Sequence, residues 1–138
     1  MATSAPGCIR QAAVIAVRDG RVCLVMSSSG KRWVIPKGCL EPDKTAGEVA
    51  LQEAWEEAGL VGVLRPEPLG SYLYEKYGNR YHVVVFLMHV TQAAEEWPES
   101  GVRERCWLTP TQALVRIEER GLRELIRGIM AERAELRA

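Results

Sequence analysis

The apolar positions along this chain predict a series of strands, one central helix and a helical tail. Residues 9–17 and 21–26 are apolar runs joined by Asp19-Gly20, a dipeptide typical of the tight turn in an antiparallel hairpin. Gly78-Asn79 is expected to be the turn of a second hairpin, whose second strand is the strongly apolar one. The further strands are expected at residues 32–35, 69–76, 80–91 and 104–108.

Residues 45–58 predict a helix that separates its charged and apolar side chains onto opposite sides. Thr45 suits an N-cap, because Glu48 follows three residues later and completes a capping box. Gly59 follows the last helical residue and is expected to end the helix. The apolar side is expected to pack on the core, and it consists of Leu51, Ala54, Trp55 and Ala58.

The tail, residues 111–137, has apolar residues at the three- and four-residue spacing of a helix. Thr109 and Pro110 suit the start of a helix, with Thr as the cap and Pro in the first turn. Gly121 and Gly128 are expected to be the breaks. The apolar stripe is expected to be core or a dimer surface, and it consists of Leu122, Leu125, Ile126, Ile129 and Met130. Residues 1–7 are expected to form a loose terminus.

Three carboxylates form what we call the acid strip of the central helix. Glu53, Glu56 and Glu57 stand at positions i, i+3 and i+4, so they share one side of it. Three like charges on one strip repel one another unless a cation offsets them. Magnesium takes oxygen ligands and is often held by carboxylates together with substrate phosphates. The strip therefore predicts a metal site, and a solvated acidic face is the alternative for this fragment alone.

Composition and charge narrow the classes of function. The chain has 138 residues, of which 47% are hydrophobic and 26% charged, values that suit one globular domain. Its net charge of zero argues against a general nucleic-acid binder. Residues 1–40 carry basic side chains against one Asp, whereas residues 41–57 are acidic apart from Lys44. A basic segment beside an acidic one suits a polyphosphate substrate that is bridged to a protein-held metal.

The sequence also gives an expectation for the cellular setting. Its four cysteines are scattered, with neither a C-x-x-C pair nor a zinc-type spacing. It contains no apolar run long enough to cross a membrane and no signal-peptide pattern. A reducing, cytoplasmic setting without a membrane partner is therefore expected.

The stretch from Gly38 to Leu60 resembles the box of the Nudix hydrolases. Two positions differ from that box: Lys44 stands where it has Glu, and Gln52 stands where it has Arg. In the family these two usually form a structural ion pair, and replacing both together leaves no lone buried charge. Lys44 and Glu48, four residues apart, could supply a local replacement. The matching positions are Gly38, Glu53, Ala54, Glu56, Glu57, Gly59 and Leu60.

The resemblance implies a fold, a reaction and a ligand set. The implied fold is α/β, a Nudix-type α/β/α sandwich with a mixed β-sheet between helices, formed by residues 1–138 as a single domain. The implied enzyme is a pyrophosphohydrolase that uses Mg²⁺ or Mn²⁺. Glu53 and Glu57 are expected as the principal metal ligands, Glu56 as a ligand or general base, and the backbone carbonyl of Gly38 as a further ligand. Because family members differ in their base, the later carboxylates also remain candidates: Glu96, Glu99 and Glu104.

Pieces outside the box resemble the branch that contains diphosphoinositol polyphosphate phosphohydrolases. They are residues 26–38, 56–62, 90–100 and 103–113. That branch binds highly phosphorylated inositols or dinucleoside polyphosphates in a basic groove. Its members carry a glycine triplet where this chain has Pro36-Lys37-Gly38-Cys39, so both substrate classes stay open. By position, the groove residues are expected to be Arg10, Ser28, Arg32 and His82, with Lys37 as an added cation.

The expected function is hydrolysis of a phosphoanhydride bond in a nucleoside- or inositol-type diphosphate derivative. The partner is then a small-molecule polyphosphate, and the chain is a monomer or a homodimer. Two other classes stay open: a non-catalytic metabolite-sensing module on a Nudix fold, and an RNA 5′-end pyrophosphohydrolase. Retention of all three Glu residues argues against the first, and zero net charge argues against the second.

Overall fold

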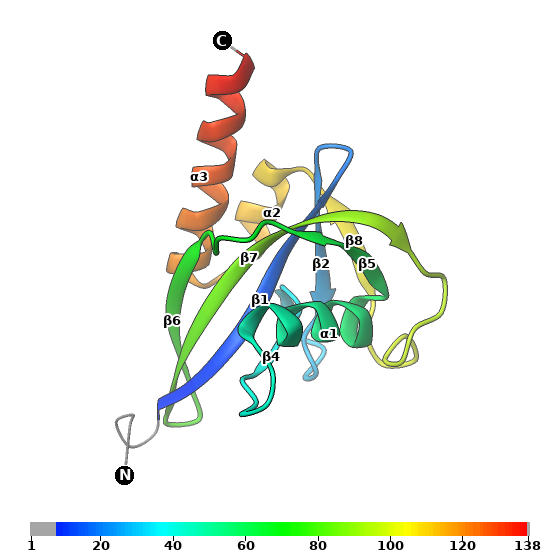
Figure 1. Cartoon of the computed structure of the whole chain (residues 1–138), viewed down its shortest axis with the longest axis vertical. Coiled ribbons are helices and arrows are strands. Elements are labelled where there is room, and N and C mark those ends of the chain that lie inside the picture. The colour runs from blue at the N-terminus through cyan, green and yellow to red at the C-terminus, as the bar shows by residue number, and fades with distance from the viewer. Residues whose placement is uncertain (1–7, 138) are drawn as a thin grey trace.

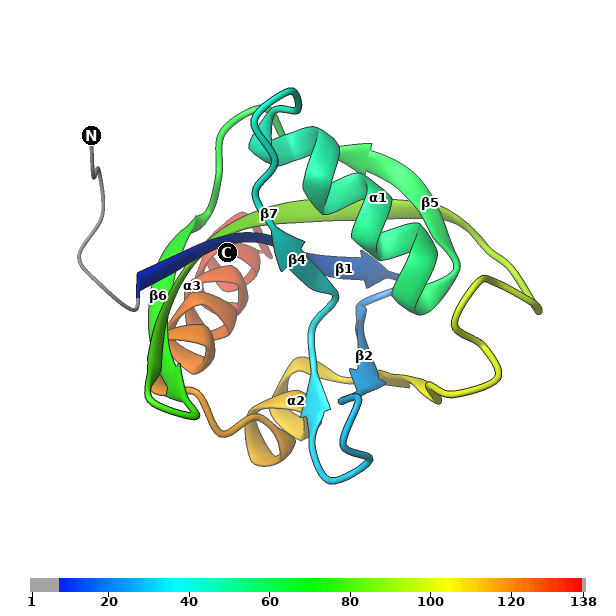
Figure 2. The same cartoon turned by 90° about the horizontal axis from the view of Figure 1, so that it is seen from below.

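In the computed structural model, which describes residues 8–137, helices lie on both sides of a twisted mixed sheet (Figures 1 and 2). The terminus predicted to be loose, residues 1–7, lies outside the described residues. The strands are β1 (Cys8–Arg18), β2 (Arg21–Met26), β3 (Trp33–Val34), β4 (Lys37–Cys39), β5 (Leu60–Leu64), β6 (Gly70–Lys76), β7 (Asn79–Ala93) and β8 (Arg105–Leu108). The helices are α1 (Ala46–Ala58), α2 (Pro110–Arg116) and α3 (Arg120–Arg137).

The sheet is built around two long parallel strands. β1 and β7 pair in parallel from Cys8↔Arg80 to Val17↔His89, and the main strand order is β3-β2-β1-β7-β5. The remaining strands extend this path by antiparallel pairing: β4 pairs with β1, β6 with β7 and β8 with β2. Parallel neighbours need a long crossover, which here carries the chain through α1 and its flanking strands. The α/β/α sandwich with a mixed sheet is therefore confirmed.

Neighbouring residues of the central strands enter two different cores. Ile15 lies in the core that α2 and α3 cover, whereas Val14 beside it lies in the core that α1 covers. Both side chains are fully buried. A strand that is covered on both faces needs apolar residues at every position, so β1 reads as a continuous apolar run.

The two hairpins differ in how well the sequence located their turns. Asp19 and Gly20 both have left-handed φ values, 52° and 74°, as the predicted two-residue turn requires. In the second hairpin the left-handed pair is Tyr77 and Gly78, with φ values of 51° and 77°. Asn79 already pairs with Lys76, so this turn lies one residue earlier than expected.

The helical tail is divided at a place that the glycines did not mark. Residues 117–119 separate α2 from α3, whereas Gly121 and Gly128, expected as breaks, both lie inside α3. A Cβ at Gly121 would stand 2.5 Å from the Cβ of Tyr72, so this glycine lets α3 approach β6. None of the helices in the described part of the chain has an apolar stretch of membrane-spanning length. The predicted stripe is core: Leu122, Ile126 and Ile129 are buried, and Leu125 and Met130 pack beside them.

Candidate active site

The helix that carries the acid strip begins and ends as its sequence predicts. The Thr45 hydroxyl accepts from the Glu48 N–H at 3.1 Å, and the Glu48 carboxylate accepts from the Thr45 N–H at 2.8 Å. At the other end Gly59 adopts a left-handed φ of 68°, and its N–H reaches the carbonyls of the last turn. Trp97 packs so closely on Gly59 that an added Cβ would lie 2.9 Å from it.

The buried side of α1 agrees with the expected one at Ala54 and Ala58, which are fully buried, and differs from it elsewhere. Leu51 and Trp55, predicted to lie in the core, are 37% and 39% exposed. The chain instead buries Glu57, which is only 6% exposed. Small residues, Ala50 and Ala54 among them, form the packed side, so the helix lies close to the sheet and turns its large apolar side chains outward. One member of the acid strip is therefore an interior group.

Glu53 and Glu57 form a hydrogen-bonded carboxyl pair. Burial, the largest cause, acts together with the hydrogen bond to Glu57 and the negative charge of that neighbour to raise the pKa of Glu53 to about 8. Burial also raises the pKa of Glu57, against the opposing charge of Arg103. A Cβ at Gly38 would stand 2.4 Å from the Glu53 carboxyl carbon, so the glycine makes room for this side chain against β4. The backbone N–H of Lys37 donates to Glu57 at 3.3 Å.

The third carboxylate of the strip has a different partner. Gln52 donates to Glu56 at 3.2 Å, and Lys44 donates to the amide oxygen of the same Gln52. The two positions at which the chain departs from the Nudix box are therefore in contact, as an ammonium–amide pair. Lys44 also lies 3.6 Å from Glu41, whereas Glu48 serves the cap of the helix. The local replacement expected from Lys44 and Glu48 is not the one that the fold uses.

Residues 97–105 donate hydrogen bonds to the C-terminal end of α1. Trp97 donates its indole N–H to the carbonyl of Glu57 at 2.9 Å, and the Glu99 N–H donates to the carbonyl of Glu56 at 3.0 Å. Arg105 donates to the carbonyl of Ala58 at 2.7 Å and lies over the Trp97 ring at 4.3 Å. Carbonyls that a helix end leaves unpaired are thus satisfied, which fixes the turn that bears the acid strip.

Arg103 links this segment to the acid strip. Its guanidinium donates to Glu99 at 2.6 Å and to the Met26 carbonyl at 2.9 Å, and it lies 3.7 Å from the Glu57 carboxylate. Both partners of the ion pair are largely buried, with side chains 14% and 8% exposed. Sequence reasoning missed this residue, because it is far from α1 along the chain and no motif marks it.

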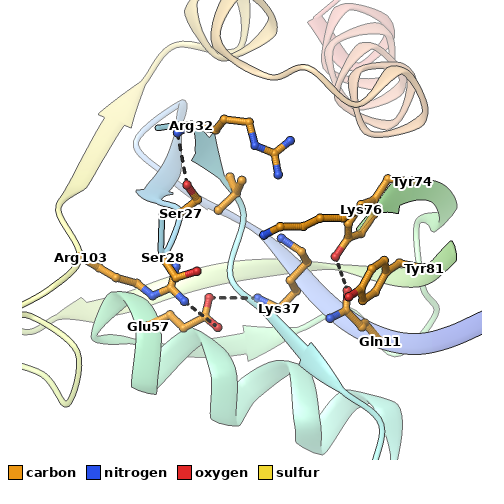
Figure 3. Close-up of a pocket in the computed structure, with 11 residues that line it drawn as sticks. Gln11, Ser27, Ser28, Arg32, Lys37, Glu57, Tyr74, Lys76, Tyr81 and Arg103 are labelled. Atoms are coloured by element: carbon orange, nitrogen blue, oxygen red, sulfur yellow. Dashed lines mark hydrogen bonds and ion pairs between the residues drawn. The ribbon is translucent and has the colours of Figure 1, made fainter. Parts of the chain in front are cut away.

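A basic pocket of about 190 Å³ opens beside this ion pair (Figure 3). Four cationic side chains line it, Arg32, Lys37, Lys76 and Arg103, against a single carboxylate, Glu57. Burial lowers the pKa of Lys37, against the opposing charges of Glu119 and Glu57. The remaining lining residues are Gln11, Ser27, Ser28, Val34, Tyr74 and Tyr81.

The structure brings some of the predicted groove residues together and leaves others apart. Ser28, Arg32 and Lys37 line the basic pocket. Arg10 and His82 pair with each other across β1 and β7 and do not line it. Their strand neighbours Gln11 and Tyr81 do, and because successive side chains of a strand point to opposite faces, Arg10 and His82 face the other side of the sheet.

An aromatic wall of the pocket also escaped the sequence reasoning. Tyr74 and Tyr81 stack with centroids 4.6 Å apart and an interplanar angle of 4°. The Tyr74 hydroxyl donates to Gln11 at 2.9 Å, and the Lys37 ammonium lies 5.5 Å from the Tyr74 ring centre. The register of β6 against β7 places the two rings opposite each other. The turn predicted one residue too late would have placed Tyr74 opposite another residue.

The donor groups fit a hard divalent cation in part. Across the described residues, no three side chains of His, Cys, Asp or Glu are gathered closely enough to hold a metal. Glu53 and Glu57 do lie together beside Gly38, where a side chain would block the approach. Metal ligands must be deprotonated, so a carboxyl group with a raised pKa, such as that of Glu53, releases its proton when a cation binds. The chemistry of this pair suits magnesium, which completes its shell with water and substrate oxygens.

Comparison with known proteins shows which family this chain is similar to. Residues 9–129 match the family profile described as NUDIX domain. The chain is 38% identical over 124 residues to Nudix hydrolase 12, mitochondrial, of Arabidopsis thaliana, covering 81% of this chain and 61% of that protein. It is 33% identical over 100 residues to diphosphoinositol polyphosphate phosphohydrolase 3-beta of Bos taurus, covering 70% and 60% respectively.

Solved structures share the fold. A C. elegans Ap4A hydrolase in a binary complex superimposes with a TM-score of 0.73 at 20% identity, covering 92% of this chain and 98% of that one. The chain spans between 45% and 61% of the length of the first three curated relatives. Two of these relatives are named mitochondrial, so the cytoplasmic setting stays a prediction. The match over residues 9–129, together with the fold and the box on α1, shows that this chain belongs to the Nudix family.

Proposed function

We propose that this chain is a magnesium-dependent hydrolase of the phosphoanhydride bond in dinucleoside polyphosphates or related nucleoside diphosphate derivatives. The observation that carries the proposal is the position of the Glu53–Glu57 carboxyl pair. Glu57 lines the basic pocket, in which four cations face one carboxylate. An anionic phosphate chain that enters the pocket is therefore delivered to the groups that suit a divalent metal.

Glu53, Glu57 and the carbonyl of Gly38 would hold the metal. The chemistry that bound magnesium supplies is neutralisation of phosphate oxygens and acidification of a water molecule. Arg32 and Lys37, which also line the pocket, would bind the phosphate chain. Arg103 would keep Glu57 ionised, because its guanidinium lies 3.7 Å from that carboxylate.

Glu56 is the carboxylate that we propose as the general base. Gln52 donates a 3.2 Å hydrogen bond to it, which fixes its orientation. In the reaction the oxygen of water forms a bond to phosphorus, the P–O bond of the anhydride breaks, and Glu56 accepts the proton. The later carboxylates are less suited, since Glu99 is paired with Arg103, and Glu96 and Glu104 are exposed.

The pocket wall favours a nucleotide-type substrate. The stacked rings of Tyr74 and Tyr81 offer an aromatic surface beside the cations. A planar base gains from contact with aromatic rings, whereas an inositol ring carries only hydroxyls and phosphates. Diphosphoinositol polyphosphates are the second candidate class, supported by the cations of the pocket and by the bovine relative that is named for them.

The test is a substrate panel with added magnesium or manganese. It would contain dinucleoside polyphosphates, diphosphoinositol polyphosphates, nucleoside triphosphates, ADP-ribose and a triphosphorylated RNA, with released phosphate or nucleotide measured. The variant is Glu57→Gln, which keeps the shape of the side chain. The matched control is Glu67→Gln, an exposed glutamate on the loop between β5 and β6 that does not line the basic pocket. Metal binding by each protein is measured in parallel by calorimetry.

We expect dinucleoside polyphosphates to be hydrolysed by the wild type and by Glu67→Gln, and the rate to fall at least about a hundredfold in Glu57→Gln. Hydrolysis of another substrate class alone would show that the proposed substrate is wrong and the proposed reaction is right. Metal binding without hydrolysis of any member would favour the sensing module. Absence of both metal binding and hydrolysis would refute the proposed site.

A further inference from the structure

A buried carboxylate from the helical tail reaches the back of the basic pocket. Glu119 lies in the connection between α2 and α3, and its carboxylate accepts from the Arg32 guanidinium at 3.2 Å. The Glu119 side chain is 6% exposed, whereas that of Arg32 is 29% exposed. Arg32 lines the pocket and Glu119 does not, so the carboxylate lies behind the cation.

The backbone around Glu119 is held at several points. Its carbonyl accepts from the Arg123 N–H at 3.1 Å, which starts α3. The Arg123 guanidinium donates to the carbonyls of Leu114 and Ile117 at the end of α2. Ile117 is buried on one side of Glu119 and Leu122 on the other. The carboxylate is therefore presented by a rigid junction of two helices.

The backbone of Arg32 is held by hydrogen bonds as well. Its N–H donates to the Ser27 hydroxyl at 3.2 Å (Figure 3). Its carbonyl accepts from the Ser27 N–H at 2.7 Å. These two bonds close the loop between β2 and β3. An arginine that is held at backbone and guanidinium loses little further side-chain freedom when it binds a phosphate, so little conformational entropy opposes the binding.

From these contacts we infer that Glu119 is a positioning residue, which holds the Arg32 guanidinium at the pocket wall in the orientation that binds the phosphate chain of a polyphosphate ligand. The inference rests on the proposed function, and it gives the helical tail a part in ligand binding beyond its contribution to the core.

The simplest competing explanation predicts the opposite change in anion affinity when Glu119 is replaced. If Glu119 acted only as a negative charge near an anion site, its removal would strengthen the binding of anions. If it positions Arg32, its removal weakens their binding. The variant is Glu119→Gln, which is nearly isosteric and uncharged. The matched control is Glu118→Gln, since Glu118 is the preceding residue and is exposed.

The first measurement is calorimetric binding of inorganic tripolyphosphate to the metal-free full chain. We expect Glu119→Gln to bind about tenfold more weakly than the wild type and Glu118→Gln to match the wild type. In the Arg32→Ala background the Glu119→Gln change is expected to have no further effect, because the carboxylate acts through that guanidinium. The second measurement is hydrolysis, for which KM is expected to rise about tenfold with kcat within about twofold.

Three results would overturn the inference: binding by Glu119→Gln that equals or exceeds the wild type, a further tenfold loss in the double variant, or no tripolyphosphate binding by the wild type. If Glu119→Gln does not fold, Glu119→Asp takes its place. Its charge remains but stands one methylene further from Arg32, and unchanged binding would equally refute positioning. Hydrolysis by the wild type with unaltered binding in the variant would refute this inference alone, whereas the expected binding pattern without hydrolysis would refute only the proposed function.

Discussion

The carboxyl pair of Glu53 and Glu57 predicts that the metal-free protein loses stability as the pH rises. Burial raises the pKa of Glu53 from its ordinary 4.5 to about 8, with the hydrogen bond to Glu57 acting in the same direction. The folded protein therefore holds this proton more tightly than the unfolded chain. Stability from this group is complete below pH 4.5 and is lost between pH 4.5 and pH 8.

The magnitude follows from the raised pKa and from the exposure of the group. At about 1.4 kcal/mol per pH unit, the change in pKa sets an upper limit of roughly 5 kcal/mol. Glu53 is only partly buried, so solvent screening reduces this contribution, and we expect about 2 kcal/mol. The charge of Glu57, whose pKa is also raised, acts in the same direction.

The assay is urea unfolding of the wild type and Glu53→Gln at pH 5, 7 and 9 in the presence of a chelator. The difference between the two proteins reports the titration of Glu53 together with its effect on Glu57, because the remaining titrating groups are common to both. The free energy of unfolding of the wild type should fall by about 2 kcal/mol more than that of the variant between pH 5 and 9. Magnesium binding near pH 7 should also release protons, which calorimetry in buffers of different ionisation enthalpy measures. The raised pKa of Glu53 would be refuted if the unfolding free energies of both proteins changed equally with pH and magnesium binding released no protons.

Three further predictions concern packing and the altered box. Gly121→Ala should lower the free energy of unfolding by about 2 kcal/mol, because its Cβ would meet β6. Gly128→Ala should raise it by about 0.5 kcal/mol, because its Cβ meets nothing within 4 Å. Urea unfolding that shows the same change in free energy for both variants would disprove this. Trp97→Ala should lower the free energy of unfolding by about 3 kcal/mol and reduce the metal affinity measured by calorimetry. An unchanged metal affinity would show that the contact of Trp97 with the end of α1 does not position the acid strip. The double variant Lys44→Glu with Gln52→Arg should retain hydrolysis and the melting temperature of the wild type, whereas Lys44→Glu alone should lower the melting temperature. An equal fall in melting temperature in both variants would argue against a paired role of the two positions.

The sequence by itself determined the features that depend on neighbours along the chain. The capping box of Thr45 and Glu48 and the left-handed Gly59 bound α1, and all are local hydrogen-bond or backbone effects. The turn at Asp19-Gly20 and the helix start at Thr109 belong to the same kind. The spacing of the acid strip on α1 is local too, which is why the family and its box could be identified before the fold.

Tertiary structure decided the direction in which each side of α1 faces. The sequence pattern placed Trp55 in the core and the carboxylates outside, since apolar side chains gain from burial. In the fold, Arg103 and the Lys37 N–H from distant segments satisfy Glu57, so a charged group can be buried there. No local pattern reports a partner that lies 46 residues away along the chain.

The pocket depended on strand register and on the packing of the tail. A shift of the turn by one residue changes which side chains of β6 and β7 are opposite each other, so the stacking of Tyr74 on Tyr81 could not be predicted. Glu119 reaches Arg32 across 87 positions, because α3 packs back against the sheet. The sequence therefore determined the elements and the chemistry that they carry, and the pairing of distant segments decided which of those groups share one site.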